Sequence, residues 1–259
     1  MSELNAELHK ALATFAAHAQ ILVALDFDGT VSPLVDRPEN ARPLPATASA
    51  LARLGRLPGV HTALVSGRNL DSLAEVYPQG RPDNLIGSHG AERVVPHLAE
   101  ESELHIALDE HAASLLASIT EALGEVSDRF EGVTLEFKPA STVLHTRQAN
   151  AGDAQRATEQ ALSALASFDG VKLLRGKSVI EASVHEADKG LALRWLKEAL
   201  DVPAMLFVGD DVTDEDGFKV LTGDDLGVKV GAGETAAQFR IDEAADLPAL
   251  LESLIFMRG

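Results

Sequence analysis

The chain has 259 residues, of which 46% are hydrophobic, and its formal net charge at pH 7 is −18. The hydrophobic content is sufficient for a buried core in one or two domains, whereas the acidic balance argues against general binding to nucleic acids or anionic membranes. The absence of cysteine excludes disulfides, thiolate metal sites and a cysteine nucleophile.

We expect a cytoplasmic location, because the absence of cysteine fits a reducing compartment. Glu3 and Glu7 are acidic and no long apolar run follows them, so this region lacks the basic start and apolar core of a signal peptide. No stretch reaches the length of a transmembrane helix. Residues 3–19 instead predict an amphipathic helix, because Leu8, Leu12 and Phe15 recur at helical spacing.

Residues 21–25 predict a strand that is buried on both faces, since all five are aliphatic. The strand is followed by Asp26 and Asp28, and carboxylates beside a core are normally paired, hydrogen-bonded or bound to a metal. In a regular strand the two side chains would point to opposite faces, so they converge only if the chain turns, which Gly29 permits. An ordinary Asp-Gly turn is the alternative.

A strand-helix-strand unit follows an irregular, proline-rich loop over residues 31–45. A helix containing Leu51 and Leu54 precedes a second strand at 60–65, and a third short strand is expected at 85–87. This alternation predicts a mainly parallel sheet whose strands end on one ligand-binding edge. Ser66 would therefore lie on the same edge as Asp26, although it could instead cap the next helix.

The pattern changes from about residue 95. A helix, two strands, a second helix and two more strands predict an inserted α+β unit, with these segments at 104–123, 132–137, 141–146, 151–168 and 171–181. We therefore expect a core domain formed by residues 1–94 and 184–259, and a second domain formed by residues 95–183. The predicted fold class is α/β, with a Rossmann-like, mainly parallel sheet and an inserted α+β domain.

The first turn of the next predicted helix has an unfavourable local sequence. Asp188 is expected to cap this helix, which places Lys189 and Gly190 in its first turn. A cation there opposes the helix dipole, and glycine weakens the helix. A bound anion would explain both residues, whereas an exposed lysine near a helix end is the alternative.

A further buried strand, at 204–208, also ends in acid. Thr213 with Asp216 resembles a capping box, but this does not explain Asp210 and Asp211, which would repel each other and Asp26 without a cation between them. Oxygen ligands without cysteine favour magnesium. A last strand at 225–230 and a closing helix at 246–257 complete the expected elements.

One edge of the sheet is thus expected to hold an aspartate pair, a hydroxyl, a lysine and an acidic cluster. Phosphoryl transfer needs this set: a carboxylate nucleophile, a metal and a lysine to neutralise the developing charge, and a second acid to protonate the leaving oxygen. The four segments that supply these groups resemble, in order, the four motifs of the haloacid dehalogenase superfamily of phosphatases; they are residues 26–30, 65–68, 188–190 and 209–214.

Within this superfamily the chain is similar to the trehalose-6-phosphate phosphatase family over nearly its whole length. The similar segments are the loop from Pro33 to Pro45, Ser88-His89-Gly90-Ala91-Glu92 and the long motif from Gly209 to Phe218. The chain departs from the family at Glu181-Ala182-Ser183-Val184, where the family usually has a basic residue and proline after the glutamate.

The resemblance implies a catalytic role for each motif. Asp26 would be the nucleophile that becomes an aspartyl phosphate, and Asp28 the acid that protonates the departing sugar oxygen and then activates water. Ser66 and Lys189 would hold the phosphate oxygens. Magnesium would be bound by Asp26, the backbone carbonyl of Asp28 and Asp210, with Asp214 or Asp211 in support.

The resemblance also implies that the inserted unit is a cap over the sugar. The expected substrate-binding residues of the core are Ser66, Gly67 and Arg68. Those of the cap are Lys138, His145, Arg147 and Glu181, each of which could instead be a solvated strand residue.

Our hypothesis from the sequence is a monomeric, magnesium-dependent phosphatase that converts trehalose 6-phosphate to trehalose and phosphate. Its partner would be a sugar phosphate, with no nucleic acid and no membrane. A phosphatase of another sugar phosphate is an alternative, because the core motifs do not specify the sugar. A non-catalytic sugar-phosphate sensor, or the regulatory partner of a synthase, is disfavoured because Asp26, Asp28 and Lys189 are all present.

Overall fold

The computed structural model describes residues 5–96, 98, 103–105, 108, 110–176, 178–184 and 188–259. It forms two compact units: Met1–Leu104 with Asp188–Gly259, and His105–Ala187. Residues 3 and 4, at the start of the predicted N-terminal helix, lie outside the described ranges. Within these ranges, no helix is long and apolar enough to cross a membrane.

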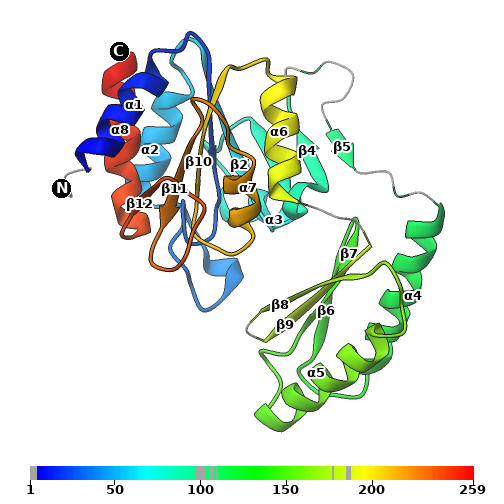
Figure 1. Cartoon of the computed structure of the whole chain (residues 1–259). Coiled ribbons are helices and arrows are strands. Elements are labelled where there is room, and N and C mark those ends of the chain that lie inside the picture. The colour runs from blue at the N-terminus through cyan, green and yellow to red at the C-terminus, as the bar shows by residue number, and fades with distance from the viewer. Residues whose placement is uncertain are drawn as a thin grey trace. The chain divides into compact units, whose positions relative to one another are not determined.

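The first unit is built on an eight-stranded sheet in the order β12-β11-β10-β1-β2-β3-β4-β5 (Figure 1). Neighbouring strands from β12 to β3 are parallel, and β4 is antiparallel to β3. The central strand β1 is buried along its whole length, as its aliphatic sequence predicts. The strands are β1 Ile21–Leu25, β2 Val60–Val65, β3 Asn84–Gly87, β4 Glu92–Val94, β5 Glu103–His105, β10 Ala204–Gly209, β11 Leu226–Val230 and β12 Phe239–Ile241.

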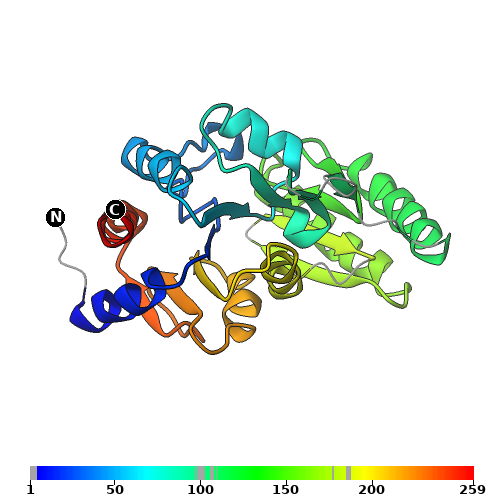
Figure 2. The ribbon, with the colours of Figure 1, turned by 90° about the horizontal axis from the view of Figure 1, so that it is seen from above.

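Helices cover both faces of this sheet. Alternate residues of β1 serve two separate cores: Val23 and Leu25 pack with α1, α2, α3 and α8, whereas Leu22 and Ala24 pack with α6 and α7. Figures 1 and 2 show α1, α2 and α8 grouped on one side and α6 on the other. The helices are α1 Ala6–Ala16, α2 Pro45–Leu54, α3 Leu70–Val76, α6 Lys189–Ala199, α7 Asp214–Lys219 and α8 Leu247–Arg258, and the 3-10 helices are η1 Pro38–Asn40, η2 Ser88–Gly90 and η3 Ala244–Asp246.

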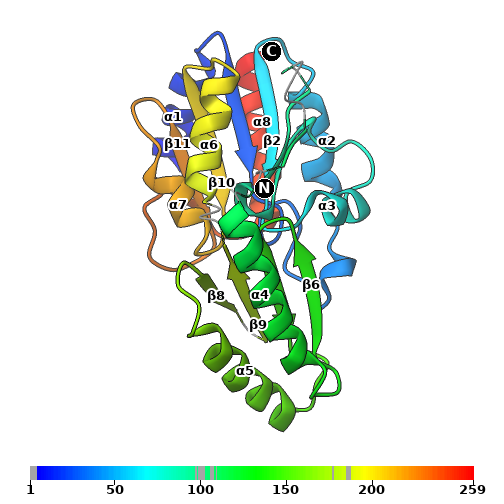
Figure 3. The same cartoon turned by 90° about the vertical axis from the view of Figure 1, so that its right-hand side faces the viewer.

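The second unit is an α+β unit with a four-stranded antiparallel sheet in the order β6-β7-β9-β8. Its two helices pack on one face of the sheet through an apolar core that includes Leu123, Leu144 and Ile180; Figure 3 shows α4 in front of the strands. The other face is mostly polar but also carries Val143, Leu174 and Val179. The elements are α4 Glu110–Ser127, β6 Thr134–Lys138, β7 Ser141–His145, α5 Ala151–Leu165, β8 Lys172–Gly176 and β9 Val179–Ser183.

The α/β class with a mainly parallel sheet is confirmed, but some local predictions are wrong. The helix expected from residue 104 begins at Glu110, and Glu103–His105 form β5 at the sheet edge. Leu104 fits a helical period, so strand pairing has overridden the local pattern. The three-residue strands β4 and β12 are missed because they are too short for a period to be read.

Candidate active site

The candidate site lies where parallel strands of the first unit end. Asp26 follows β1 and remains in the sheet, because its N–H donates to Val208 O at 2.9 Å. Ser66 follows β2 and donates its N–H to Ile86 O, also at 2.9 Å. Asp210 follows β10. As predicted, residues that are far apart in the sequence lie together at the edge formed by the carboxyl ends of the strands.

Lys189 is a buried ion-pair partner in this site. As predicted, Asp188 caps α6, accepting from Gly190 N at 2.6 Å, and Lys189 is the first helical residue. The lysine is 3% exposed. Its Nζ donates to Asp26 Oδ1 at 2.6 Å and to Asp214 Oδ1 at 2.7 Å. These two carboxylates explain the cation in the first turn.

The adjacent glycine has a packing explanation. A Cβ on Gly190 would lie 2.3 Å from the backbone oxygen of Asp216, so α6 and α7 can approach each other only if residue 190 lacks a side chain. Both unusual residues in the first turn are thus accounted for by neighbours within the first unit, without a bound anion.

Burial and charge act in opposite directions on the lysine. Burial by itself lowers the pKa of Lys189, but the carboxylates of Asp26 and Asp214 outweigh it and raise the pKa above its ordinary value. Lys189 is therefore charged at every physiological pH. Burial raises the pKa of Asp26 well above its ordinary value; Lys189 opposes this, whereas the negative charges of Asp214 and Asp210 add to it.

Asp214 closes the turn after β10. The predicted capping box is wrong: Thr213 has helical backbone angles and its side chain makes no capping bond. Instead, the fully buried Asp214 accepts through Oδ2 from the N–H groups of Asp210 and Asp211, both at 2.9 Å. Its other oxygen accepts from Lys189, so both carboxylate oxygens are fixed.

Three carboxylates in the site could hold a metal ion. Asp26, Asp210 and Asp214 each offer an oxygen, and these atoms lie within 4.8 Å of one another. Burial, followed by the negative charges of Asp214 and Asp211, raises the pKa of Asp210 to about 6. Among the residues that the structure describes, Asp210 Oδ1 is buried without a hydrogen-bond partner. An all-oxygen set with an unsatisfied buried oxygen fits a hard divalent cation.

The two residues proposed to support the metal differ in position. Asp214 belongs to the carboxylate cluster, whereas Asp211 is exposed and lies outside it. Gly29 has a φ of +85°, and a Cβ there would lie 2.0 Å from Asp210 Oδ2, so the chain approaches the cluster closely at this glycine. The geometry therefore favours Asp214 over Asp211 as the residue that supports the metal site.

Asp28 and Ser66 are linked through Arg68. The guanidinium of Arg68 donates to both oxygens of Asp28, from Nε to Oδ2 at 2.6 Å and from Nη2 to Oδ1 at 2.8 Å. The backbone N–H of Arg68 donates to Ser66 Oγ at 3.1 Å, so the serine proton stays available to an incoming acceptor. Gly67, between Ser66 and Arg68, packs closely against the His89 ring: a Cβ on Gly67 would lie 2.5 Å from His89 Cε1.

In the second unit, three of the four expected substrate-binding side chains share a sheet face. Lys138 Nζ donates to Glu181 Oε2 at 3.1 Å, and His145 Nε2 lies 2.9 Å from Glu136 Oε2. By strand alternation this face is opposite to the helices. The fourth, Arg147, is exposed beyond the end of β7.

Two hydrogen-bond partners of these residues, on the same face, were not among the expected site residues. Ser141 Oγ donates to Glu181 Oε1 at 2.6 Å, and Glu136 pairs with His145. Their positions could have been found from the pairing of the hairpin strands, in which Lys138 lies opposite Ser141 and Glu136 opposite Val143.

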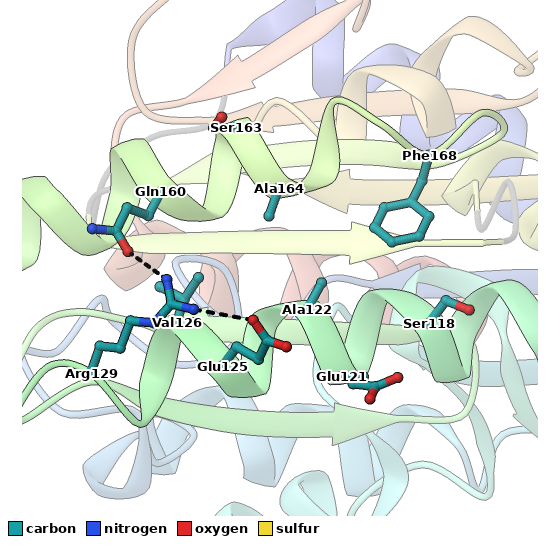
Figure 4. Close-up of a pocket in the computed structure, with 10 residues that line it drawn as sticks. All are labelled: Ser118, Glu121, Ala122, Glu125, Val126, Arg129, Gln160, Ser163, Ala164 and Phe168. Carbon is teal, nitrogen blue, oxygen red and sulfur yellow. Dashed lines mark hydrogen bonds and ion pairs between the residues drawn. The ribbon is translucent and has the colours of Figure 1, made fainter.

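A groove of about 550 Å³ lies on the helical side of the second unit, between α4 and α5 (Figure 4). Arg129 crosses it, donating to Glu125 Oε2 at 3.1 Å and to Gln160 Oε1 at 3.3 Å. The sheet separates this groove from Lys138 and Glu181, so it is not part of the expected sugar-binding face.

Comparison with known proteins gives one consistent result. Residues 24–244 match the model of a family described as trehalose-phosphatase. The chain is 32% identical over 257 residues to a bifunctional trehalose-6-phosphate synthase/phosphatase of Thermoproteus tenax, covering 98% of this chain and 34% of the relative. It is 32% identical over 251 residues to a trehalose-phosphate phosphatase of Mycobacterium avium, covering 90% of this chain and 61% of the relative.

The chain therefore spans about a third to three-fifths of the length of these curated relatives. A solved structure of the C-terminal domain of a trehalose-6-phosphate phosphatase from C. albicans has the same fold, with a TM-score of 0.77, 21% identity, and coverage of 100% of this chain and 99% of that chain.

Proposed function

The chain belongs to the trehalose-phosphatase family, and from this premise we propose that it hydrolyses trehalose 6-phosphate to trehalose and inorganic phosphate. The observation that carries the proposal is the Asp26 carboxylate, which is buried at the carboxyl edge of the sheet, bonded to the Lys189 ammonium and clustered with two further carboxylates. This arrangement suits a carboxylate that accepts a phosphoryl group. The names of the curated relatives support trehalose 6-phosphate as the substrate.

In the first step of the proposed mechanism, a carboxylate oxygen of Asp26 attacks phosphorus and the bond between phosphorus and the sugar oxygen breaks. The sugar oxygen takes its proton from the carboxyl group of Asp28, and Asp26 becomes an aspartyl phosphate. Lys189 and the Ser66 hydroxyl bind the phosphoryl oxygens and stabilise their charge. Lys189 suits this role because it is held in place and permanently charged.

In the second step, water hydrolyses the aspartyl phosphate. Asp28, now ionised, accepts a proton from water while the water oxygen attacks phosphorus. The bond between phosphorus and the Asp26 oxygen breaks and inorganic phosphate leaves. Asp26 is again a carboxylate and Asp28 is again protonated, so the residues return to their starting states.

We infer that the cation of this site is Mg²⁺, because its candidate ligands are all oxygen atoms. Asp26, Asp210 and the backbone carbonyl of Asp28 would hold it, with Asp214 in support. When bound, the ion supplies positive charge that neutralises the transferred phosphoryl group. The unsatisfied oxygen of Asp210 supports this assignment.

The second unit is proposed to be a cap that binds the sugar through its polar sheet face. Lys138, His145 and Glu181 would contact the hydroxyl groups of trehalose from this face, with Arg147 beyond its edge. Their shared orientation supports the proposal. Ser66 and Gly67 would meet the phosphate end of the substrate. The domain boundaries at residues 94/95 and 183/184, the monomeric state and the cytoplasmic location stay predictions.

The decisive experiment measures phosphate release from trehalose 6-phosphate, glucose 6-phosphate and sucrose 6-phosphate, each with Mg²⁺ and with chelator. Selective, Mg²⁺-dependent release from trehalose 6-phosphate is expected. A clear preference for another sugar would retain the chemistry but reject the substrate. Tight binding of trehalose 6-phosphate without release from any ester would reject catalysis in favour of a sensor.

A further inference from the structure

Arg68 is held on all sides by the first unit. Besides its two bonds to Asp28, its Nη2 donates to Pro38 O at 2.9 Å and its Nη1 to Ser72 Oγ at 3.1 Å. The guanidinium carbon lies 5.5 Å from the centre of the Phe27 ring, which places the cation over an aromatic face. These partners come from η1, α3 and the segment after β1, so the guanidinium joins three separate parts of the fold.

These contacts leave Arg68 little capacity to bind another molecule. A guanidinium has five N–H donors, and four hydrogen bonds from Nε, Nη1 and Nη2 are already present. The side chain is only 11% exposed, compared with 36% for Asp28. The carboxylate, rather than the guanidinium, is therefore the accessible member of the pair.

A half-buried aspartate in a loop needs support if it is to deliver a proton at a fixed point. Asp28 lies past the end of β1, where strand pairing does not fix its side chain. A planar guanidinium that binds both carboxylate oxygens sets the rotation of the carboxylate as well as its position. Each oxygen still has lone-pair positions for a further partner, so Asp28 can contact substrate or water while it stays paired.

We propose that Arg68 is a positioning residue for Asp28 and does not bind the substrate itself. The proline-rich loop takes part, because its Pro38 carbonyl is one of the groups that hold the guanidinium. This inference rests on the proposed function only in that Asp28 is the acid and base of a phosphatase. It gives Arg68 a different role from the substrate contact that the family resemblance implies.

A double-mutant cycle separates the two roles. Wild type, R68M, D28N and R68M/D28N are compared by kcat and KM for trehalose 6-phosphate. If Arg68 acts through Asp28, we expect R68M to lower kcat about 10- to 100-fold with KM changed less than about 3-fold, as for a misplaced catalytic group. In the D28N background the same substitution should have an effect of less than about 3-fold, because the residue it positions is already inactive.

Several controls make the result decisive. R53M removes an arginine whose ion pair with Glu252 is half exposed, and it should leave kcat unchanged. R68K keeps the positive charge but cannot make the bidentate hydrogen bonds of a guanidinium, so its kcat should lie between those of R68M and wild type. If R68M does not fold by circular dichroism, the same cycle is run with R68K. Losses that multiply in the double mutant, or an R68M defect that lies mainly in KM, would overturn the proposal.

Failure of the substrate assignment would be recognised separately. If the wild type releases phosphate from p-nitrophenyl phosphate but not from trehalose 6-phosphate, the proposed substrate is wrong. The cycle is then repeated with p-nitrophenyl phosphate, and additive or non-additive losses decide the role of Arg68 in the same way.

Discussion

Replacement of Asp210 by asparagine should stabilise the metal-free protein at neutral pH. In the folded chain, burial and the charges of Asp214 and Asp211 raise the pKa of Asp210 from 3.8 to about 6. Between these two values the folded state keeps a proton that the unfolded state has lost, so the free energy of unfolding falls as pH rises. The stability that the protonated residue supplies below pH 4 is lost once the pH has passed 6.

The size of this effect follows from the two pKa values. The pKa of Asp210 differs between 3.8 in the unfolded chain and about 6 in the folded chain, and each pKa unit corresponds to about 1.4 kcal/mol. The free energy of unfolding can therefore rise by at most about 3 kcal/mol in D210N above pH 7. Asp210 is half-buried, and solvent screening reduces the expected gain for D210N to about 1 to 2 kcal/mol. At pH 4.5 the same relation leaves about a third of the gain.

Urea unfolding in chelator, followed by the fluorescence of the single tryptophan, tests this expectation. Trp195 lies on α6 and therefore reports on the first unit. D83N is the matched control, because it removes the same charge from an exposed residue of the first unit that does not contribute to the shift, and it should change stability by less than about 0.5 kcal/mol. A D210N protein that is no more stable than wild type at pH 7.5, or equally stabilised at both pH values, would refute the reasoning. With Mg²⁺ present, the wild type should become more stable than D210N, because the ion stabilises only a folded chain that binds it.

Further expectations concern the nucleophile, the buried lysine and a tight helix contact. D26N should abolish phosphate release with an unchanged circular dichroism spectrum, and measurable turnover would contradict its assignment as the nucleophile. K189M should lower the free energy of unfolding by about 3–5 kcal/mol in urea titrations, because it leaves buried carboxylates unpaired; wild-type stability would show that the pair contributes little. G190A should cost about 1–3 kcal/mol through its clash with Asp216, whereas G124A, where a Cβ meets no atom within 4 Å, should be neutral or stabilising. Equal effects of the two glycine substitutions on thermal unfolding would argue against the close contact.

The parts of the fold that sequence predicts well are those with a strong local pattern. The aliphatic run of β1 predicts a buried strand, and the rule that parallel strands end on one edge places Asp26, Ser66 and Asp210 together. Lys189 stands out in the sequence because a cation in the first turn of a helix is unfavourable by itself. Each of these inferences needs only a few neighbouring residues and one general rule of topology.

The pairing of individual side chains could not be predicted in this way. Arg68 and Asp28 are 40 residues apart, and no local pattern indicates that the guanidinium turns to this carboxylate. The Thr213 capping box is wrong because Thr213 has helical backbone angles and its side chain makes no capping bond, while the carboxylate of the next residue, Asp214, accepts from the N–H groups of Asp210 and Asp211. Such choices depend on burial and charge in three dimensions, which sequence spacing does not contain.

The attachment of Asp26 to the central strands has a consequence for how the protein loses activity. Its amide proton is bound to Val208 O, between β1 and β10, and its exchange with solvent requires those strands to separate. We expect this amide to be among the slowest to exchange, at a rate set by global unfolding of the first unit. Mild heating would then leave the nucleophile in place until the whole unit opens, so that inactivation and unfolding coincide in time.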